Sequence, residues 1–284
     1  MNILVLGASG MLGHVVFRLL SEKSEWRIFG TIRSEADKVF FSGDISDRLL
    51  SGVDAGNFES IVQAFNISRP DVVINCIGLI KQLADADDPL EAIPINSLLP
   101  HRLAKLCETF DARLIHISTD CVFSGDKGMY REVDFADARD LYGRTKLLGE
   151  VDYDHAVTLR TSIIGPELKG AHSLLAWFLS QSESCFGFTR AIFSGVPTIA
   201  LAYIIRDIFI SRADLHGLYH VASKPISKFD LLSLIAEIYG KKITIVPKDD
   251  LVIDRSLDPT MLELETGYEV AGWPELIKLM YRFG

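Results

Sequence analysis

The residues best suited to chemistry are Tyr142 and Lys146, which stand four residues apart in the stretch Asp140-Leu-Tyr-Gly-Arg-Thr-Lys-Leu-Leu-Gly-Glu150. On a helix this spacing places both side chains on one face, one turn apart. A free tyrosine has a pKa of roughly 10, and a neighbouring ammonium lowers that pKa by favouring the phenolate. The pair could therefore exchange a proton with a sugar or alcohol oxygen. The spacing alone fits a packed tyrosine beside a solvated lysine at least as well.

A second chemical signal is the glycine pattern Gly7-Ala-Ser-Gly10-Met-Leu-Gly13. It comes after the apolar run 2–6 and precedes an amphipathic run over 14–24, so it predicts a buried strand, a tight turn and a helix. Such glycines let the backbone approach a pyrophosphate at the helix N-terminus. The spacing differs from the usual Gly-x-Gly-x-x-Gly, and a turn with close helix packing is the alternative. Its place between strand and helix favours a nucleotide.

The cofactor type depends on the residues just after the second predicted strand, which runs over 26–31. Arg33 comes next, and no acid appears before Glu35. An arginine suits a 2′-phosphate, whereas an acid would bind the ribose hydroxyl of NAD, so NADPH is favoured and NADH stays open. A third strand is predicted near 38–41. Asp44 after it would bind the adenine amino group or cap a turn.

The elements that must position these residues alternate between strand and helix. Strands are predicted over 71–77 and 113–117, with a helix over 97–109 between them, and Thr119 comes after the second strand. Alternation predicts an α/β fold with a Rossmann-type, doubly wound parallel sheet. Ligands bind beyond the carboxyl ends of such strands. The residues expected at those ends are Gly7, Arg33, Asp44, Gly78 and Thr119.

The pattern changes from about residue 166, which predicts a smaller α/β substrate lobe. Strands are expected over 188–194, 217–221 and 242–246, a turn over 195–198, and helices over 201–210, 227–239 and 273–281. Ser227 is the expected cap of the second of these helices. We therefore assign 1–165 plus 199–223 to a cofactor-binding core and 166–198 plus 224–284 to the lobe.

Composition excludes several classes of protein. The net charge is −9 and no basic stripe offsets it, so no nucleic-acid partner is expected. No apolar stretch is long enough to cross a bilayer, and no secretory leader precedes Gly7. The cysteines form no Cys-x-x-Cys motif, so free thiols and no metal are expected. We expect a cytoplasmic protein without a membrane partner and leave open a homodimer.

In this order and spacing, the motifs resemble those of the extended short-chain dehydrogenase/reductases, and among them the dTDP-4-dehydrorhamnose reductase type. The resemblance covers nearly the whole chain. Its N-terminal part lies in 7–13, in Ile117-Ser-Thr-Asp-Cys-Val-Phe-Ser-Gly125 and in 142–150. Its C-terminal part lies in Leu159-Arg-Thr-Ser162, 197–198, 217–221 and Arg255-Ser-Leu-Asp258.

The resemblance implies an NADP-dependent oxidoreductase in which Tyr142 gives a proton to a ketone oxygen while hydride arrives. Thr119 would hydrogen-bond that oxygen, and Lys146 would lower the tyrosine pKa and bind the nicotinamide ribose. The expected cofactor-binding residues are Gly7, Ser9, Gly10, Met11, Leu12, Arg33, Asp44, Ile45, Cys76, Ile77, Gly78, Asn96, Tyr142 and Lys146. The expected substrate-binding residues are Asp120, Cys121, Arg190 and Arg255. Lys224 and Lys228 are further candidate diphosphate partners.

The implied reaction is reduction of the C4 ketone of a nucleotide-linked 4-keto-6-deoxyhexose, in surface-polysaccharide precursor synthesis. Cys121 stands where the family often has tyrosine, and Ile163 and Ile164 stand where it often has an aromatic. The sugar can therefore differ, and a UDP-linked N-acetyl sugar is as plausible as dTDP-4-dehydrorhamnose.

Two alternatives stay open. An NAD-dependent sugar-nucleotide epimerase or dehydratase would use the same three residues, although dehydratases usually place an acidic pair after the catalytic Thr or Ser, and here Asp120 is followed by Cys121. A non-catalytic binding subunit is also compatible, because this fold serves as a regulatory partner of a methionine adenosyltransferase. The complete set of Thr119, Tyr142 and Lys146 argues against that subunit. A hydrolase is excluded, since neither a Gly-x-Ser-x-Gly nor a His-Glu-x-x-His motif occurs.

Overall fold

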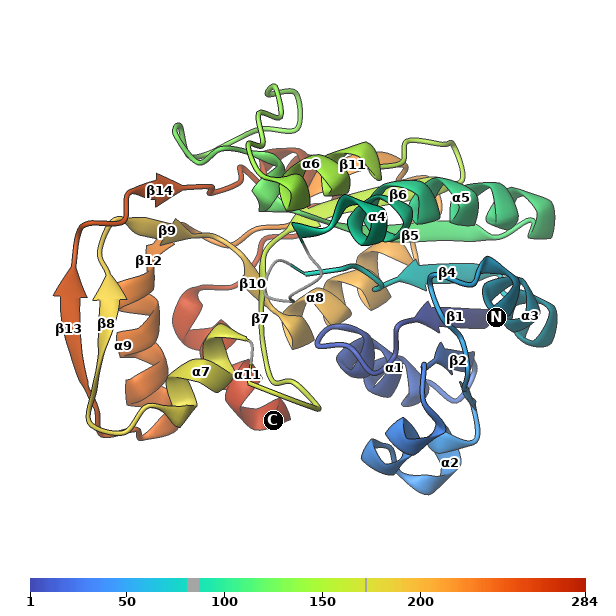
Figure 1. Ribbon diagram of the computed structural model, residues 1–284, viewed down its shortest axis with the longest axis horizontal. Coiled ribbons are helices and arrows are strands. Elements are labelled where there is room, and N and C mark those ends of the chain that lie inside the picture. Colours follow the sequence, from blue (N-terminus) through green and yellow to red (C-terminus); the bar gives the residue numbers. More distant parts are fainter. Residues whose placement is uncertain (81–86, 172) are drawn as a thin grey trace. The chain divides into compact units, whose positions relative to one another are not determined.

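The computed structural model describes residues 1–80, 87–171 and 173–284, which form two compact units (Figure 1). Unit 1 comprises 1–118, 140–159 and 202–218, and unit 2 comprises 119–139, 160–201 and 219–284. The domain bounds assigned from the sequence divide the chain by expected function rather than by compactness, and they stay a prediction.

Unit 1 is built on a seven-stranded sheet with the order β11-β6-β5-β4-β1-β2-β3. The pairs β1–β2, β1–β4, β2–β3 and β4–β5 are parallel. The α/β class and the parallel sheet predicted from the alternating pattern are therefore confirmed. The last residues of β5, β6 and β11 belong to unit 2. The strands are β1 Asn2–Leu6, β2 Arg27–Thr31, β3 Leu49–Leu50, β4 Val72–Asn75, β5 Arg113–Thr119, β6 Ala156–Thr161 and β11 Gly217–His220.

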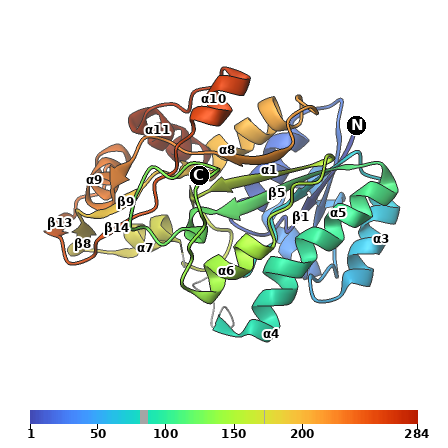
Figure 2. The same cartoon turned by 90° about the horizontal axis from the view of Figure 1, so that it is seen from above.

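Helices cover both faces of this sheet: α3 and α5 lie on one side of β1 and α1 on the other (Figure 2). Side chains alternate between the faces of a strand, so Leu4 and Leu6 of β1 point to the same face. They pack there against Ile61 of α3 and Leu103 of α5 in one buried cluster. The helical segments of unit 1 are α1 Gly13–Ser21, η1 Glu35–Phe40, α2 Gly43–Ser46, α3 Phe58–Ser68, α4 Pro89–Ala92, the π-helical turn η3 Ile93–Leu98, α5 Leu99–Phe110, α6 Leu141–Leu148 and the π-helical turn η5 Ile205–Phe209.

The strand predicted near 38–41 is wrong, because this segment forms the 3-10 helix η1. The Ser34 hydroxyl accepts a hydrogen bond from Ala36 N at 3.3 Å and so caps the helix start. Val39, which suggested a strand, is 80% exposed and packs in no core. The third strand of the sheet is instead β3, a short element whose Leu49 pairs with Gly30 of β2.

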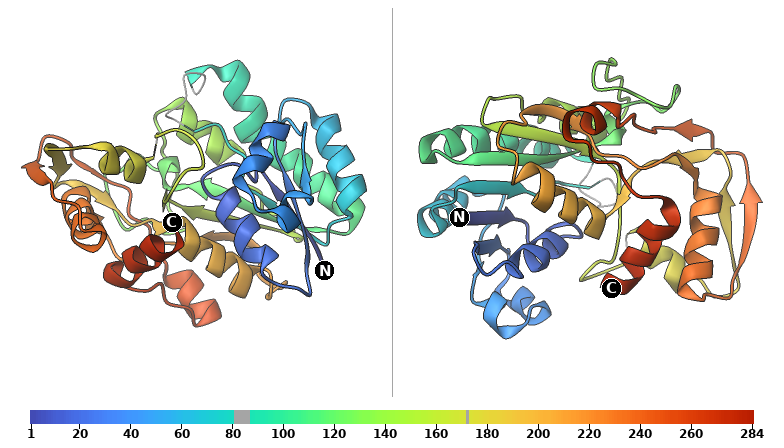
Figure 3. Two further views of the ribbon diagram at one scale, coloured as in Figure 1. Left: turned by 90° about the horizontal axis from the view of Figure 1, so that it is seen from below. Right: turned by 180° about the vertical axis from the view of Figure 1, so that it is seen from behind.

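Unit 2 contains three small sheets and several helices, and α9 is prominent among them (Figure 3). Helix α9 packs on α11 and β8, and Ser227 caps it as predicted, accepting from Asp230 N at 3.0 Å. The sequence prediction missed β7, β8, β12, β14 and α10, and it assigned the residues of β10 to a turn. The elements are η4 Asp120–Val122, β7 Ile163–Ile164, α7 Leu174–Ser180, β8 Ser184–Phe188, β9 Ala191–Phe193, β10 Val196–Pro197, β12 Ile226–Ser227, α9 Lys228–Tyr239, β13 Thr244–Lys248, β14 Ile253–Asp254, α10 Thr260–Thr266 and α11 Trp273–Phe283. Helix α8 Thr198–Ile204 passes from unit 2 into unit 1.

None of the helices in the described ranges has both the length and the apolar character that crossing a membrane requires.

Candidate active site

Helix α6 carries Tyr142 and Lys146 and confirms that the two side chains are one helical turn apart. Asp140 begins the helix, because its carboxylate accepts a hydrogen bond from Gly143 N at 2.8 Å. Tyr142 is partly exposed, whereas Lys146 is only 5% exposed. A tyrosine that a ligand can reach thus stands one turn from a buried ammonium.

The buried ammonium of Lys146 is held by the main chain of β5, where its Nζ donates to Ile117 O at 2.7 Å. Burial lowers the pKa of Lys146 from 10.5 to about 8, while the carboxylate of Glu150 acts in the opposite direction. The side chain is therefore charged at pH 7 but loses its proton only slightly above it. An ammonium in this setting can lower the pKa of a neighbouring phenol and donate hydrogen bonds to hydroxyl groups.

The glycine turn before α1 is tightly packed, and its first and last positions require glycine. Gly7 adopts φ +77°, and a Cβ there would lie 3.1 Å from Ile77. A Cβ on Gly13 would lie 2.1 Å from Gly7 O, so only glycine lets α1 start this close to β1. In the described part of the chain no side chain caps α1, and its first turn holds no acid. Its backbone N–H groups are thus suited to an anion.

Three of the expected cofactor residues, Gly78, Asn96 and Lys146, are brought together beyond the end of β4. A Cβ on Gly78 would lie 3.6 Å from Asn96 Oδ1 and 3.9 Å from Lys146 Nζ. Asn96 is buried and holds both backbone groups of Leu79, accepting from its N at 2.9 Å and donating to its O at 3.1 Å. Burial raises the pKa of Cys76 to about 12, so that residue is a neutral thiol. This edge can hold a cofactor beside Lys146.

The adenosine end of the expected site is only partly as predicted. Arg33 is exposed just beyond β2, which suits an arginine reaching for a phosphate. The nearest acid, Glu35, is paired with Lys38 at 2.8 Å. Asp44 and Ile45 lie on α2, which precedes β3, so the expectation that Asp44 comes after a strand is wrong. The cause is the 3-10 helix η1, which displaces the third strand along the chain.

Unit 2 brings together three of the residues expected to bind substrate, and Thr119 begins the turn that carries two of them. The Thr119 hydroxyl accepts from Cys121 N at 3.1 Å and so caps η4. Arg255 Nε donates to Phe123 O at 2.8 Å, and its Nη1 lies 3.4 Å from Cys121 Sγ. Burial raises the pKa of Asp120, and the positive charge of Arg255 opposes that rise. The result is a compact polar cluster beside Thr119.

The other cationic residues of unit 2 that are candidates for binding the diphosphate are Arg190, Lys224 and Lys228. Arg190 has an exposed side chain, and its main-chain oxygen accepts from Ile253 N at 3.1 Å. Lys224 is exposed as well, whereas Lys228 is half-buried and close enough to Asp120 to favour its ionised form. Among the residues that the structure describes, no three His, Cys, Asp or Glu side chains are grouped to hold a metal ion.

Two residues that the sequence did not single out also belong to the surroundings of Lys146. Ser118 Oγ donates to Glu150 Oε1 at 2.6 Å. Glu150 is four residues beyond Lys146, a spacing that could have indicated it. The contact with Ser118 joins segments far apart in the chain, so no local sequence pattern predicts it.

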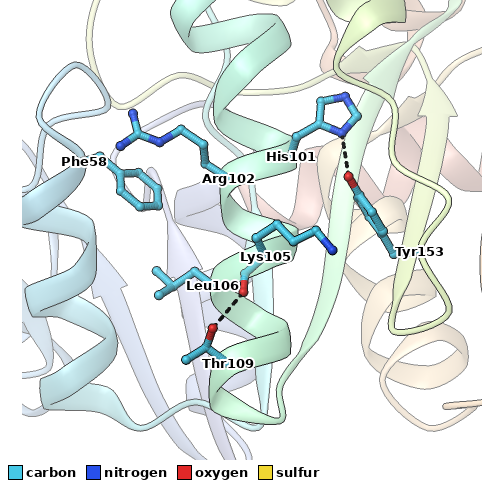
Figure 4. Close-up of a pocket in the computed structure, with 7 residues that line it drawn as sticks. All are labelled: Phe58, His101, Arg102, Lys105, Leu106, Thr109 and Tyr153. Atoms are coloured by element: carbon cyan, nitrogen blue, oxygen red, sulfur yellow. Dashed lines mark hydrogen bonds between the residues drawn. The ribbon is translucent and has the colours of Figure 1, made fainter.

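A pocket of about 420 Å³ is lined by residues of α5 together with Phe58 and Tyr153 (Figure 4). Its cations are engaged with aromatic rings: Arg102 lies 3.8 Å from the ring centre of Phe58, and Lys105 lies 4.9 Å from that of Tyr153. His101 Nδ1 lies 3.3 Å from Tyr153 Oη. The described residues that line this pocket include none of the expected site residues.

Comparison with known proteins gives consistent matches. Residues 1–251 match the family model described as RmlD substrate binding domain. The chain is 30% identical to the probable low-salt glycan biosynthesis reductase Agl14 of Haloferax volcanii, over 85% of this chain and 81% of that protein. It is 32% identical to methionine adenosyltransferase 2 subunit beta of Xenopus laevis, over 84% of this chain and 72% of that protein.

Solved structures share the fold. A hypothetical dTDP-4-dehydrorhamnose reductase from Sulfolobus tokodaii has a TM-score of 0.79 at 25% identity, over 96% of this chain and 98% of that one. The dTDP-4-dehydrorhamnose reductase of Bacillus anthracis, solved in complex with NADP, has a TM-score of 0.79 at 21% identity, over the full length of both chains.

Proposed function

Because the chain belongs to the RmlD substrate binding domain family, we propose that it catalyses NADPH-dependent reduction of the C4 ketone of a nucleotide-linked 4-keto-6-deoxyhexose. The substrate is dTDP-4-dehydrorhamnose or a UDP-linked N-acetyl analogue, made for surface polysaccharides. The observation that carries this proposal is the buried Lys146 one helical turn after Tyr142, next to Gly78 and Asn96 beyond the end of β4.

In this proposal the bound NADPH supplies the hydride, and the protein supplies a proton and positioning. Tyr142 transfers its phenolic proton to the ketone oxygen as the alkoxide forms. Thr119 donates a hydrogen bond to the same oxygen and orients the carbonyl. The charged Lys146 favours the phenolate that Tyr142 becomes and donates hydrogen bonds to the nicotinamide ribose.

The cofactor would be held by the residues at the strand ends. The uncapped start of α1 and the turn from Gly7 to Leu12 favour the pyrophosphate. Arg33 is the partner proposed for the 2′-phosphate, because the next acid in the sequence, Glu35, is already paired with Lys38. The Bacillus anthracis relative was solved with NADP and the Bordetella bronchiseptica enzyme WbmH with NAD+, so NADH is the second candidate.

The substrate would be held by residues of unit 2. Asp120 and Cys121 follow Thr119 in the chain, and Arg255 contacts Cys121 and acts on the charge of Asp120, which supports a role for all three at the sugar. Arg255 is our first choice for binding the diphosphate. Within the described residues its Nη1 donates to Cys121 Sγ at 3.4 Å, and because sulfur is a weak acceptor, a phosphate oxygen could replace it. Binding energy from base and phosphates would orient the sugar for reduction.

The test is to incubate the purified protein with NADPH and freshly made 4-keto-6-deoxy sugars on dTDP, UDP and GDP. Absorbance of the reduced nicotinamide should fall with at least one of them and not with the matched 4-hydroxy sugars. Interconversion of finished sugars by an NAD-loaded protein without net redox would instead support the epimerase.

A second candidate function is a nucleotide-binding regulatory subunit, favoured by the 32% identity to methionine adenosyltransferase 2 subunit beta. The complete set of Thr119, Tyr142 and Lys146 argues against it. The two functions separate in one experiment: a regulatory subunit would bind NADPH, leave every 4-keto sugar unreduced, and change the activity of a methionine adenosyltransferase mixed with it.

A further inference from the structure

Ser118, which is buried, and Glu150, which is half-buried, form a polar pair that the proposed reaction does not use. The Ser118 hydroxyl donates to Glu150 Oε1 at 2.6 Å, and Ser118 is only 4% exposed. Both residues adjoin Lys146: Ser118 comes after Ile117, whose carbonyl accepts from Lys146 Nζ at 2.7 Å, and Glu150 stands four residues after Lys146. The carboxylate of Glu150 lies close enough to Lys146 to favour its charged form, and Ser118 of β5 holds that carboxylate.

The backbone that carries Glu150 is fixed. Glu150 N donates to Leu147 O at 3.2 Å, and Gly149 N donates to Lys146 O at 3.1 Å. A Cβ on Gly149 would lie 1.9 Å from Asn96 O, which shows how closely the end of α6 packs on η3. The backbone at Glu150 is therefore held against the end of α6, and the Ser118 hydroxyl holds its carboxylate.

Glu150 is the charged group that acts on Lys146 among the described titratable residues around it. Cys76, at the end of β4, is a neutral thiol because burial raises its pKa to about 12. His116, on β5, is neutral because burial lowers its pKa well below 6.5. On the helical side, η3 has no titratable residue, and Glu91 of α4 is exposed. On α6 itself, Arg144 is exposed to water.

We propose that Glu150, held in place by the Ser118 hydroxyl, is a positioning residue that keeps Lys146 charged and fixed for its action on Tyr142. A buried ammonium without a compensating carboxylate tends to lose its proton. The role at Tyr142 rests on the proposed function, whereas the electrostatic coupling between Glu150 and Lys146 does not.

The direction of the effect is set by the charges. A carboxylate stabilises the ammonium, so replacing Glu150 with Gln should lower the pKa of Lys146 below its value of about 8. Reduction needs the charged lysine, so its rate should fall as pH rises through that pKa. The high-pH limb of the rate profile should therefore move to lower pH in the variant.

The primary experiment needs neither substrate nor activity. Protein labelled with ¹³Cε-lysine is titrated by NMR, and Lys146→Met identifies the resonance of Lys146. Glu150→Gln should lower its midpoint by about one pH unit, and Ser118→Ala should lower it by less, because the carboxylate stays but loses its support. Glu108→Gln, which removes the exposed acid paired with Lys105 on α5, should leave it unchanged.

An unchanged midpoint in both Glu150→Gln and Ser118→Ala would overturn the proposal. If Glu150→Gln does not fold, Ser118→Ala alone decides, since a small hydroxyl is lost without a buried charge. A shifted midpoint in a protein that reduces no sugar would support the electrostatic coupling and reject the proposed function, so the two failures are distinguishable.

Discussion

The proposed reaction depends on the charge of a few side chains, and Lys146 is the first of them. Lys146 is 5% exposed, and its Nζ keeps one described main-chain acceptor, Ile117 O. Placing a charge there costs stability, and a residue that only filled space would be apolar. We interpret the buried ammonium as a feature retained for its effect on Tyr142.

Replacing Tyr142 by Phe removes the proposed proton donor and changes little volume. We expect the rate of sugar reduction to fall by roughly 10² to 10⁴, with NADPH affinity nearly unchanged. Steady-state rates and a fluorescence titration of NADPH measure the two quantities. Tyr239→Phe, on α9, is the matched control for loss of a phenol, and a fully active Tyr142→Phe enzyme would reject the assignment.

The pKa of Lys146 makes stability depend on pH. Its folded pKa of about 8 is below the ordinary lysine pKa of 10.5, so the unfolded chain binds more protons between these values. The free energy of unfolding should therefore rise with pH across this window, and the cost of the buried charge is fully present below it.

Relative to that of Lys146→Met, the free energy of unfolding of the wild type should rise by about 2 kcal/mol between about pH 7.5 and about pH 10. Urea unfolding of both proteins at the two pH values measures this, because other titrating groups are common to both. A constant difference would mean that Lys146 has an ordinary pKa in the folded protein.

Arg33 should decide the choice of cofactor. Arg33→Ala removes the proposed partner of the 2′-phosphate, so KM for NADPH should rise by about tenfold or more while KM for NADH changes little. Initial rates with each cofactor give the comparison, and Arg27→Ala, on an exposed position of β2, is the control. An equal loss with both cofactors would assign Arg33 to the fold or to the pyrophosphate.

Among the elements, α6 is too short to be stable alone, and its neighbours hold it in place. Asp140 caps its start, the Ser97 hydroxyl donates to Thr145 O at 2.8 Å, and Gly149 ends it against η3. These contacts set where Tyr142 and Lys146 stand.

Gly149→Ala should therefore destabilise the protein by about 1–3 kcal/mol, because the new Cβ would overlap Asn96 O, a backbone atom. Gly43→Ala is the matched control, since a Cβ there meets none of the described atoms within 4 Å. Chemical denaturation of both variants measures the difference. Equal stability would show that η3 moves aside easily.

Across the full chain, the two expected ligands divide between the two units. Every proposed cofactor residue belongs to unit 1, and Thr119 and the proposed substrate residues belong to unit 2. Each ligand should therefore protect a different set of peptides from hydrogen exchange.

Hydrogen exchange measured by mass spectrometry should show this division. NADPH should slow exchange in peptides that cover 7–13 and 76–79, because a bound ligand suppresses local opening. A nucleotide sugar added with the oxidised cofactor should further protect 119–123 and 253–257. Protection of 119–123 by the sugar without any effect of NADPH on 7–13 would contradict the assignment of the glycine turn.

The class of fold and the candidate catalytic residues were predictable from the amino-acid sequence. Local patterns suffice for that: alternating apolar runs predict strands and helices, and the helical spacing of Tyr142 and Lys146 depends only on their separation. The capped start of α9 at Ser227 was predictable for the same reason. The predicted strand over 38–41 failed because Ser34 and a surface ion pair favour a 3-10 helix there over an apolar run without a core.

Contacts between residues far apart in the chain required the three-dimensional structure. Ser118 reaches Glu150, Asn96 holds Leu79, and Arg255 contacts the turn at Cys121 because strands and helices pack, and no periodicity encodes those pairs. The same holds for the burial of Lys146, whose lowered pKa arises from desolvation by residues that surround it in the fold. Residue identity can be read along the chain, whereas charge state depends on the three-dimensional environment.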